Sequence, residues 1–220
     1  MNIIEKNNLI WQLKSWKLNA ILITIILTLS LTANLIGHRL IIIFGVTMYS
    51  GAFLRIAALI LLNVIRSYSK GNTIIFFIII FINLCDLFAI GYGHFISYNL
   101  GFPTYFKDAA AYQKVFSDAW HGFVGEITSV VIYLILELFL FSYIYFKWRL
   151  PFFLSVIIAA SLIMFIASYA TMYAGFVLDY PAHIEHLILD NFIRNMIVLI
   201  IFSIISQPFV YWLHRTYFES

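Results

Sequence analysis

Charged residues are scarce in this chain. Asp, Glu, Lys and Arg make up 10% of its 220 residues, against about a quarter in a soluble domain. Apolar residues make up 63%, and the mean hydropathy is +0.97. One compact core of this size cannot hide so much apolar surface from water. The scarcity of charge therefore excludes a water-soluble domain and predicts a chain that is dissolved in lipid.

Cysteine is nearly absent as well. Cys85 is the single cysteine, so the chain has no internal disulfide, and there is no C-x-x-C pair for a metal. The G-x-S-x-G, H-E-x-x-H and P-loop patterns are also missing from the sequence. We therefore expect no enzyme, no cofactor and no metal site. The expected partners are the lipid bilayer and a small-molecule substrate, with no nucleic acid, and homo-oligomerisation stays open.

What the sequence does contain is six long apolar runs, separated by charged or turn-forming residues. A hydrocarbon core about 30 Å thick needs about 20 helical residues per crossing, so each run is long enough for one transmembrane helix. A β-barrel is disfavoured because barrel strands alternate in segments of about ten residues. The sequence predicts an all-α fold, a single integral membrane domain over 1–220 that forms a six-transmembrane-helix bundle. The predicted helices are 18–37, 40–65, 73–98, 119–146, 150–178 and 191–213.

The distribution of Lys and Arg between the loops predicts the orientation of these helices, because positive residues are retained on the cytoplasmic side. Eight lie in the N-terminal segment, the second and fourth loops and the C-terminal tail, and three lie in the first and third loops. This bias predicts that both termini are cytoplasmic. The expected location is the inner (cytoplasmic) membrane of a bacterium, crossed several times.

Three charged residues fall deep inside the predicted helices. With a rise of about 1.5 Å per residue, Arg55, Asp86 and Glu137 each lie roughly 15 to 20 Å from the cytoplasmic end of their helix. A charge at this depth is costly and needs a partner, a water-filled cavity or a function. The functional hypothesis is a midplane site for a polar solute or a proton. The competing hypothesis is an ion pair that fixes the register of the helices.

Further polar residues extend this candidate site. An outer layer, which could line the mouth of a pathway or simply reach water at the interface, contains Asn34, His94, Glu126, Asp190, Arg194 and Asn195. Four tyrosines inside the bilayer could bind a flat aromatic ligand or face lipid: Tyr92, Tyr133, Tyr169 and Tyr173. The substrate-binding residues that we predict are Arg55, Asp86, Glu137, Asn34, Tyr133, Glu126 and Arg194.

Several short stretches form a pattern from residue 33 onward. They are Ala33-Asn34-Leu35, Ile43-Phe44-Gly45, Ser50-Gly51-Ala52-Phe53, Ala111 to Phe116, Ser129, Tyr133, Glu137 to Phe141, Arg149 with Ser155, and Gln207-Pro208-Phe209-Val210-Tyr211. Together they resemble the vitamin uptake transporter family. Its best-known members are queuosine precursor transporters, small six-helix proteins that carry 7-deazaguanine bases inward. The resemblance implies a divergent member of this family, in which Glu137 stands where the family has an Asp.

The chain also departs from the family pattern. After Gly51-Ala52 the family continues with a proline and then two acidic residues, whereas this chain has Phe53-Leu54-Arg55. If the acidic residues of the family contact the base, this chain either binds another solute or uses Asp86 in their place.

Two classes of transport function and one structural role remain open. The first is a secondary uptake transporter that imports a small, polar, aromatic solute, such as a queuosine precursor or a vitamin, by alternating access. The second is the substrate-binding subunit of an energy-coupling-factor vitamin importer, which would need a membrane partner and ATPases. The third is a structural membrane protein without a substrate.

Overall fold

The architecture is that of a computed structural model of the chain. It describes residues 3–36, 40–43, 46–49, 51–68, 73–99, 108–111, 113–114, 133–176, 182 and 184–217. Side chains are not described for residues 3–15, the strands at 40–49, and residues 52, 73–74, 171–172, 174–176 and 217. The predicted site residue Glu126 and the first half of the predicted helix 119–146 lie outside the described residues.

Helices dominate the described part of the chain. They are α1 (Ile3–Ile36), α2 (Ala52–Tyr68), α3 (Thr73–Asn99), α5 (Phe152–Phe176) and α6 (Ile184–Tyr217). A further helical segment covers 133–147 and ends in the π-helix η1 (Tyr143–Lys147). The strands β1 (Leu40–Ile43) and β2 (Val46–Tyr49) pair antiparallel. Among the described residues, four helices are long and apolar enough to cross a bilayer, so the chain is a multi-pass membrane protein.

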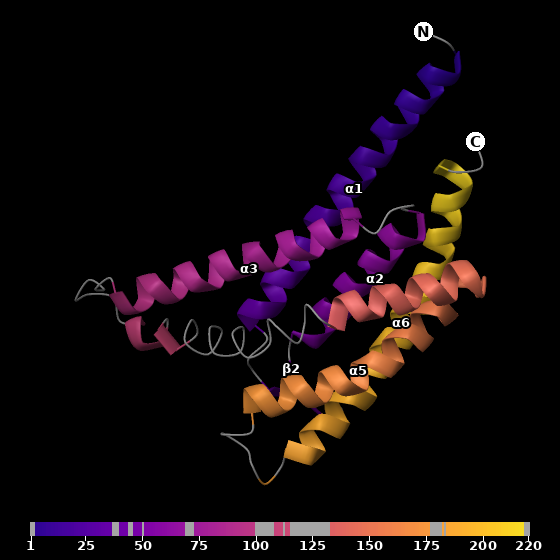
Figure 1. The fold of residues 1–220 in the computed structure, drawn as a ribbon. Coiled ribbons are helices and arrows are strands. Elements are labelled where there is room, and N and C mark those ends of the chain that lie inside the picture. The colour runs from indigo at the N-terminus through magenta and orange to yellow at the C-terminus, as the bar shows by residue number, and fades with distance from the viewer. Residues whose placement is uncertain are drawn as a thin grey trace.

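The helices form two pairs that α2 connects. α1 packs against α2, α5 packs along α6, and α2 also contacts α6. α3 crosses α1 and extends away from the α5–α6 pair (Figure 1). Both chain termini lie at the same end of the molecule, and the β1–β2 hairpin lies toward the other end (Figure 1). The buried residues of α2 therefore have neighbours on several sides.

The spacing of residues in α3 explains which of its side chains face the protein. Its buried positions recur every three or four residues and therefore share one side of the helix: Ile75, Ile78, Ile79, Ile82, Asp86, Ile90, Gly93 and Ser97. The exposed large apolar residues follow the same spacing on another side: Phe77, Ile80, Phe81, Leu84, Leu87, Phe88, Tyr92, Phe95 and Tyr98. In a membrane protein such an apolar exposed face can contact lipid. Asp86 lies in the middle of the buried face, which directs its carboxylate toward α1.

The β1–β2 hairpin corrects one predicted element. The sequence predicted a single helix over 40–65, but the structure has two strands between Leu40 and Tyr49 and begins α2 at Ala52. β-branched residues, which favour extended backbone, fill much of this run, as in Ile41-Ile42-Ile43. A continuous apolar run does not by itself distinguish a buried strand from a helix. As a result, Arg55 lies in the first turn of α2, where its backbone N–H donates to Gly51 O at 3.1 Å.

Two other predicted helices have nearly the observed boundaries, and two more are shorter than the observed helices. The helices predicted at 73–98 and 150–178 correspond to Thr73–Asn99 and Phe152–Phe176. α1 begins well before residue 18, and α6 begins at Ile184 and continues through Pro208 to Tyr217. Gln207 accepts a hydrogen bond of 3.0 Å from the backbone N–H of Phe153, which satisfies a donor at the N-terminus of α5. α5 and α6 are therefore joined by a polar contact as well as by apolar packing.

Candidate functional site

The first polar contact of the candidate site joins α1 to α3. Ser30 Oγ donates a hydrogen bond of 2.7 Å to Asp86 Oδ2. Asp86 is 3% exposed, so nearly all of its carboxylate is removed from the surroundings of the protein. Its other oxygen, Oδ1, is buried and accepts no hydrogen bond from the residues that the structure describes. A buried acceptor without a donor is unfavourable by about 1–3 kcal/mol. A ligand that donates a hydrogen bond to Oδ1 would remove this cost.

The second contact joins α1 to α2. Arg55 Nη2 donates a hydrogen bond of 2.6 Å to Asn34 Oδ1. Asn34 lies one helical turn after Ser30, so both face the same neighbours, and it is 5% exposed. Arg55 and Asn34 also interact with Asp86. α1, α2 and α3 thus each contribute to one partly buried group, which we call the Asp86 cluster: Ser30, Asn34, Arg55 and Asp86.

The Asp86 cluster offers a polar ligand both kinds of hydrogen-bonding partner. A carboxylate only accepts hydrogen bonds, a guanidinium only donates them, and the Ser and Asn side chains can do both. Charge-assisted hydrogen bonds of this type are about twice as strong as neutral ones. The cluster can therefore recognise a small solute that carries N–H donors beside a carbonyl or another acceptor.

Glu137 belongs to a different group from Asp86. It is fully buried in the segment 133–147, where it accepts a hydrogen bond of 2.9 Å from Asn63 Nδ2 of α2. Asn63 lies eight residues after Arg55, which is about 12 Å farther along α2. Tyr133, one turn before Glu137, is partly buried against the core and interacts with Glu137. The three charged residues that the sequence placed at one level thus belong to two separate groups, one at Arg55 and one at Asn63 of α2.

Arg194 lies on the contact between α5 and α6. Its guanidinium donates a hydrogen bond to Asn191 Oδ1 and also interacts with Asp190. Asn191 Nδ2 in turn donates to Ser168 Oγ at 3.1 Å. Asn191, Arg194 and Ser168 are all buried. These residues form hydrogen bonds between two packed helices, as is expected of polar side chains that hold membrane helices together.

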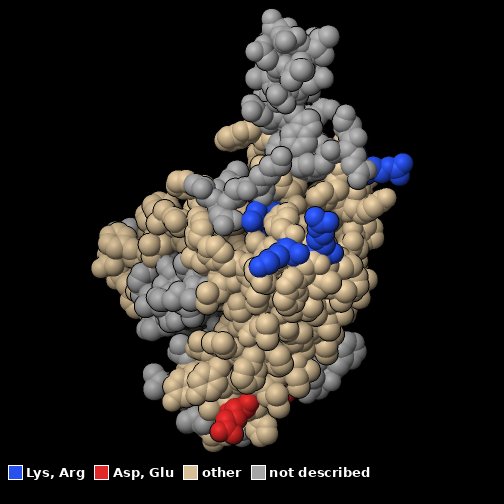
Figure 2. Space-filling view, turned by 45° about the vertical axis from the view of Figure 1, so that its right-hand side comes forward, with Lys and Arg blue, Asp and Glu red and all other residues tan. Residues whose placement is uncertain are grey.

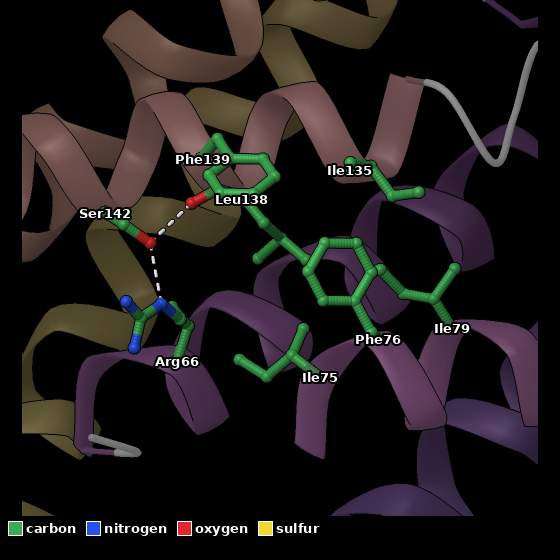
Figure 3. Close-up of a pocket in the computed structure, with 8 residues that line it drawn as sticks. All are labelled: Arg66, Ile75, Phe76, Ile79, Ile135, Leu138, Phe139 and Ser142. Atoms are coloured by element: carbon green, nitrogen blue, oxygen red, sulfur yellow. Dashed lines mark hydrogen bonds between the residues drawn. The ribbon is translucent and has the colours of Figure 1, made fainter. Parts of the chain in front are cut away.

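The described residues also form a small pocket between α2, α3 and the segment 133–147 (Figure 3). Its lining is apolar apart from Arg66 and Ser142. Arg66 Nε donates to Ser142 Oγ at 2.6 Å, and Ser142 Oγ donates to Leu138 O at 2.5 Å. Arg66 also lies over the ring of Phe146, 4.9 Å from its centroid. The pocket has no carboxylate and suits an alkyl chain better than a polar base.

Only some of the predicted site residues come together. The structure joins Asn34 to Arg55 and Asp86, although the sequence placed Asn34 in a separate outer layer. Tyr133 lies beside Glu137, whereas Tyr92, Tyr169 and Tyr173 are each about half exposed on the outer surface. Sequence reasoning missed Ser30 and Asn63 because neutral polar residues are common in transmembrane helices. Their signal was position: Ser30 is one turn from Asn34, and Asn63 interrupts an apolar run.

Comparison with known proteins adds no relative. No protein-family model matches the chain, and no curated protein and no solved structure shows significant similarity to it. The function of the chain is therefore inferred from the residues and contacts described above.

Proposed function

We propose that this chain is a secondary uptake transporter of the bacterial inner membrane. It imports a small, polar, aromatic solute by alternating access. The observation that carries this proposal is the Asp86 cluster, in which an acidic and a basic side chain from two helices meet at a third helix. A charged group inside a membrane helix is by default a candidate for a functional site.

The Oδ1 oxygen of Asp86, which has no hydrogen-bond donor among the residues that the structure describes, favours a binding role over a purely structural one. A structural polar network gains most when every buried donor and acceptor is satisfied. Here Oδ1 of Asp86 accepts no hydrogen bond from the described residues. We propose that a ring or exocyclic N–H of the solute donates to this atom, while Arg55 binds an acceptor on the same solute. A 7-deazaguanine base has this combination of groups, in keeping with the resemblance to queuosine precursor transporters.

The distribution of charge supports a membrane orientation with both termini in the cytoplasm and an even number of crossings, which we propose to be six. On the face shown in Figure 2, the Lys and Arg side chains gather toward the end of the molecule that carries the termini, and acidic side chains lie at the opposite end. Exposed basic residues include Lys147, Arg149 and Arg215, and Glu185 is exposed in the first turn of α6. Basic ends of transmembrane helices are retained in the cytoplasm.

Uptake by the purified full-length chain in proteoliposomes tests this function. We expect the protein alone to accumulate a radiolabelled 7-deazaguanine or a related base when a proton gradient is applied. Uptake that requires an added membrane partner and ATPases would instead identify a substrate-binding subunit of an energy-coupling importer. Absence of both binding and uptake for all nucleobases, 7-deazaguanines and small vitamins would contradict the proposal and favour a structural protein.

A further inference from the structure

Glu137 and Asn63 contain two buried oxygens that accept no hydrogen bond within the described part of the chain. Both residues are 0% exposed. They share one hydrogen bond, from Asn63 Nδ2 to Glu137 Oε1. The remaining polar atoms of the two side chains, Glu137 Oε2 and Asn63 Oδ1, accept no hydrogen bond from the described residues. Each side chain is therefore half satisfied, although each is in contact with the other.

The shapes of the two groups suggest how this deficit is removed. A carboxamide is planar and carries a donor beside an acceptor, and a protonated carboxyl group carries the same pair. When such groups face each other, two parallel hydrogen bonds can form between them. In this pair one of the two bonds already exists, and the two unpartnered oxygens belong to the same two side chains. One proton between them would satisfy both.

The described residues around Glu137 do not neutralise a negative charge on it. Tyr133 lies one turn away on the same helix. On α2, Arg66 is one turn beyond Asn63 and donates to Ser142. On α6, His214 contacts Tyr145, two turns beyond Glu137. Among the described residues no Lys, Arg or His pairs with Glu137 itself, and an isolated ionised carboxylate in such a site would be unfavourable by several kcal/mol.

We propose that Glu137 and Asn63 form a proton-binding site between α2 and the segment 133–147. In the described conformation Glu137 carries a proton on Oε2 and donates it to Asn63 Oδ1, while Asn63 Nδ2 donates to Glu137 Oε1. Loss of this proton leaves two oxygens facing each other and weakens the contact between the two helices. Its use as the coupling step for solute import rests on the proposed transport function, whereas the binding of the proton itself does not.

Infrared difference spectroscopy of the purified full-length protein tests the proton directly. At neutral pH we expect a C=O stretching band of a protonated carboxyl group that disappears at high pH. The band should persist in Asp86→Asn, which removes the other buried carboxyl group of the described helices, and be absent in Glu137→Gln. A wild-type protein without the band at neutral pH, or a band that Asp86→Asn removes and Glu137→Gln retains, would overturn the proposal.

Thermal stability provides a second measurement that does not depend on transport. A proton bound in the folded state stabilises the protein at low pH, and this contribution is lost as the pH rises through the titration of the site. The melting temperature of the wild type should therefore fall with rising pH. Glu137→Gln should lose most of this pH dependence, because a glutamine amide can form the same two bonds with Asn63. The control Glu185→Gln changes an exposed carboxylate of α6 and should keep it.

A small cation is the alternative ligand for two facing oxygens. If the site held sodium instead of a proton, sodium chloride would raise the melting temperature of the wild type more than choline chloride at the same ionic strength. We expect equal effects of the two salts in the wild type and in Glu137→Gln. A selective effect of sodium that Glu137→Gln abolishes would overturn the proton assignment, and it would leave the Asp86 cluster and the transport proposal unaffected.

Discussion

Arg55 Nη2 donates a hydrogen bond of 2.6 Å to the amide oxygen of Asn34 on α1. Asn34 interacts with Asp86 in turn, so the amide connects the basic and the acidic side chain of the Asp86 cluster. Asn34 therefore holds α1 in polar contact with both α2 and α3.

Asn34→Leu should destabilise the protein, because it removes a buried acceptor of the Arg55 guanidinium and places an aliphatic side chain next to that guanidinium. The expected loss is about 1–3 kcal/mol of unfolding free energy. Reversible denaturation in detergent measures it. The control is Thr32→Val, an exposed position on the same helix, which should change stability by less than about 0.5 kcal/mol. Equal stability of Asn34→Leu and the wild type would mean that the bond contributes nothing to the fold.

A second hydrogen bond joins α1 to α2 near the other end of α2. Tyr68 OH donates to Asn19 Oδ1 at 2.6 Å, and both residues are buried. Tyr68→Phe should lower the unfolding free energy by about 1–3 kcal/mol, because it leaves the Asn19 oxygen without this donor. Tyr211→Phe makes the same chemical change at a tyrosine that is 65% exposed and should be neutral. The difference between the two variants in chemical denaturation is the measurement, and no difference would contradict the assigned contact.

The proposed orientation can be tested with reporters fused after Ser220. We expect a fluorescent protein that folds only in the cytoplasm to be bright at this position. Alkaline phosphatase, which is active only after export, should be inactive there. A reporter within the predicted outer loop 179–190 should give the opposite pattern, because that segment has no Lys or Arg. The reverse result at either position would reject the orientation.

Composition and periodicity predicted the long helices because these depend on local properties of the chain. The runs that became α3 and α5 are apolar for more than 20 residues, which only a helix of this length satisfies in lipid. The hairpin at 40–49 was not predicted, because an apolar run without a clear period fits a strand or a helix. The choice between them depends on contacts with distant segments, and β2 does contact α6.

The candidate site was predicted only in part, for a similar reason. Counting residues along each helix gives depth but not rotation or tilt, and these determine which side chains meet. The sequence singled out Asp86 and Arg55, which the structure brings into one cluster, and it assigned Glu137 to the same level. The structure pairs Glu137 with Asn63 instead. Asn63 lies eight residues after Arg55 on α2, so this pair is separate from the Asp86 cluster. Such a pairing can be predicted only when the packing of the helices is known.

Binding of a 7-deazaguanine base to the purified protein, compared between the wild type and Asp86→Asn, tests the central claim most directly. A ligand at 100 times its dissociation constant stabilises a protein by about 2.7 kcal/mol, so a thermal shift reports it. We expect a clear shift in the wild type and in the control Glu185→Gln, and at least a tenfold weaker affinity in Asp86→Asn. Equal affinity of Asp86→Asn and the wild type would contradict the assignment of the solute to the Asp86 cluster.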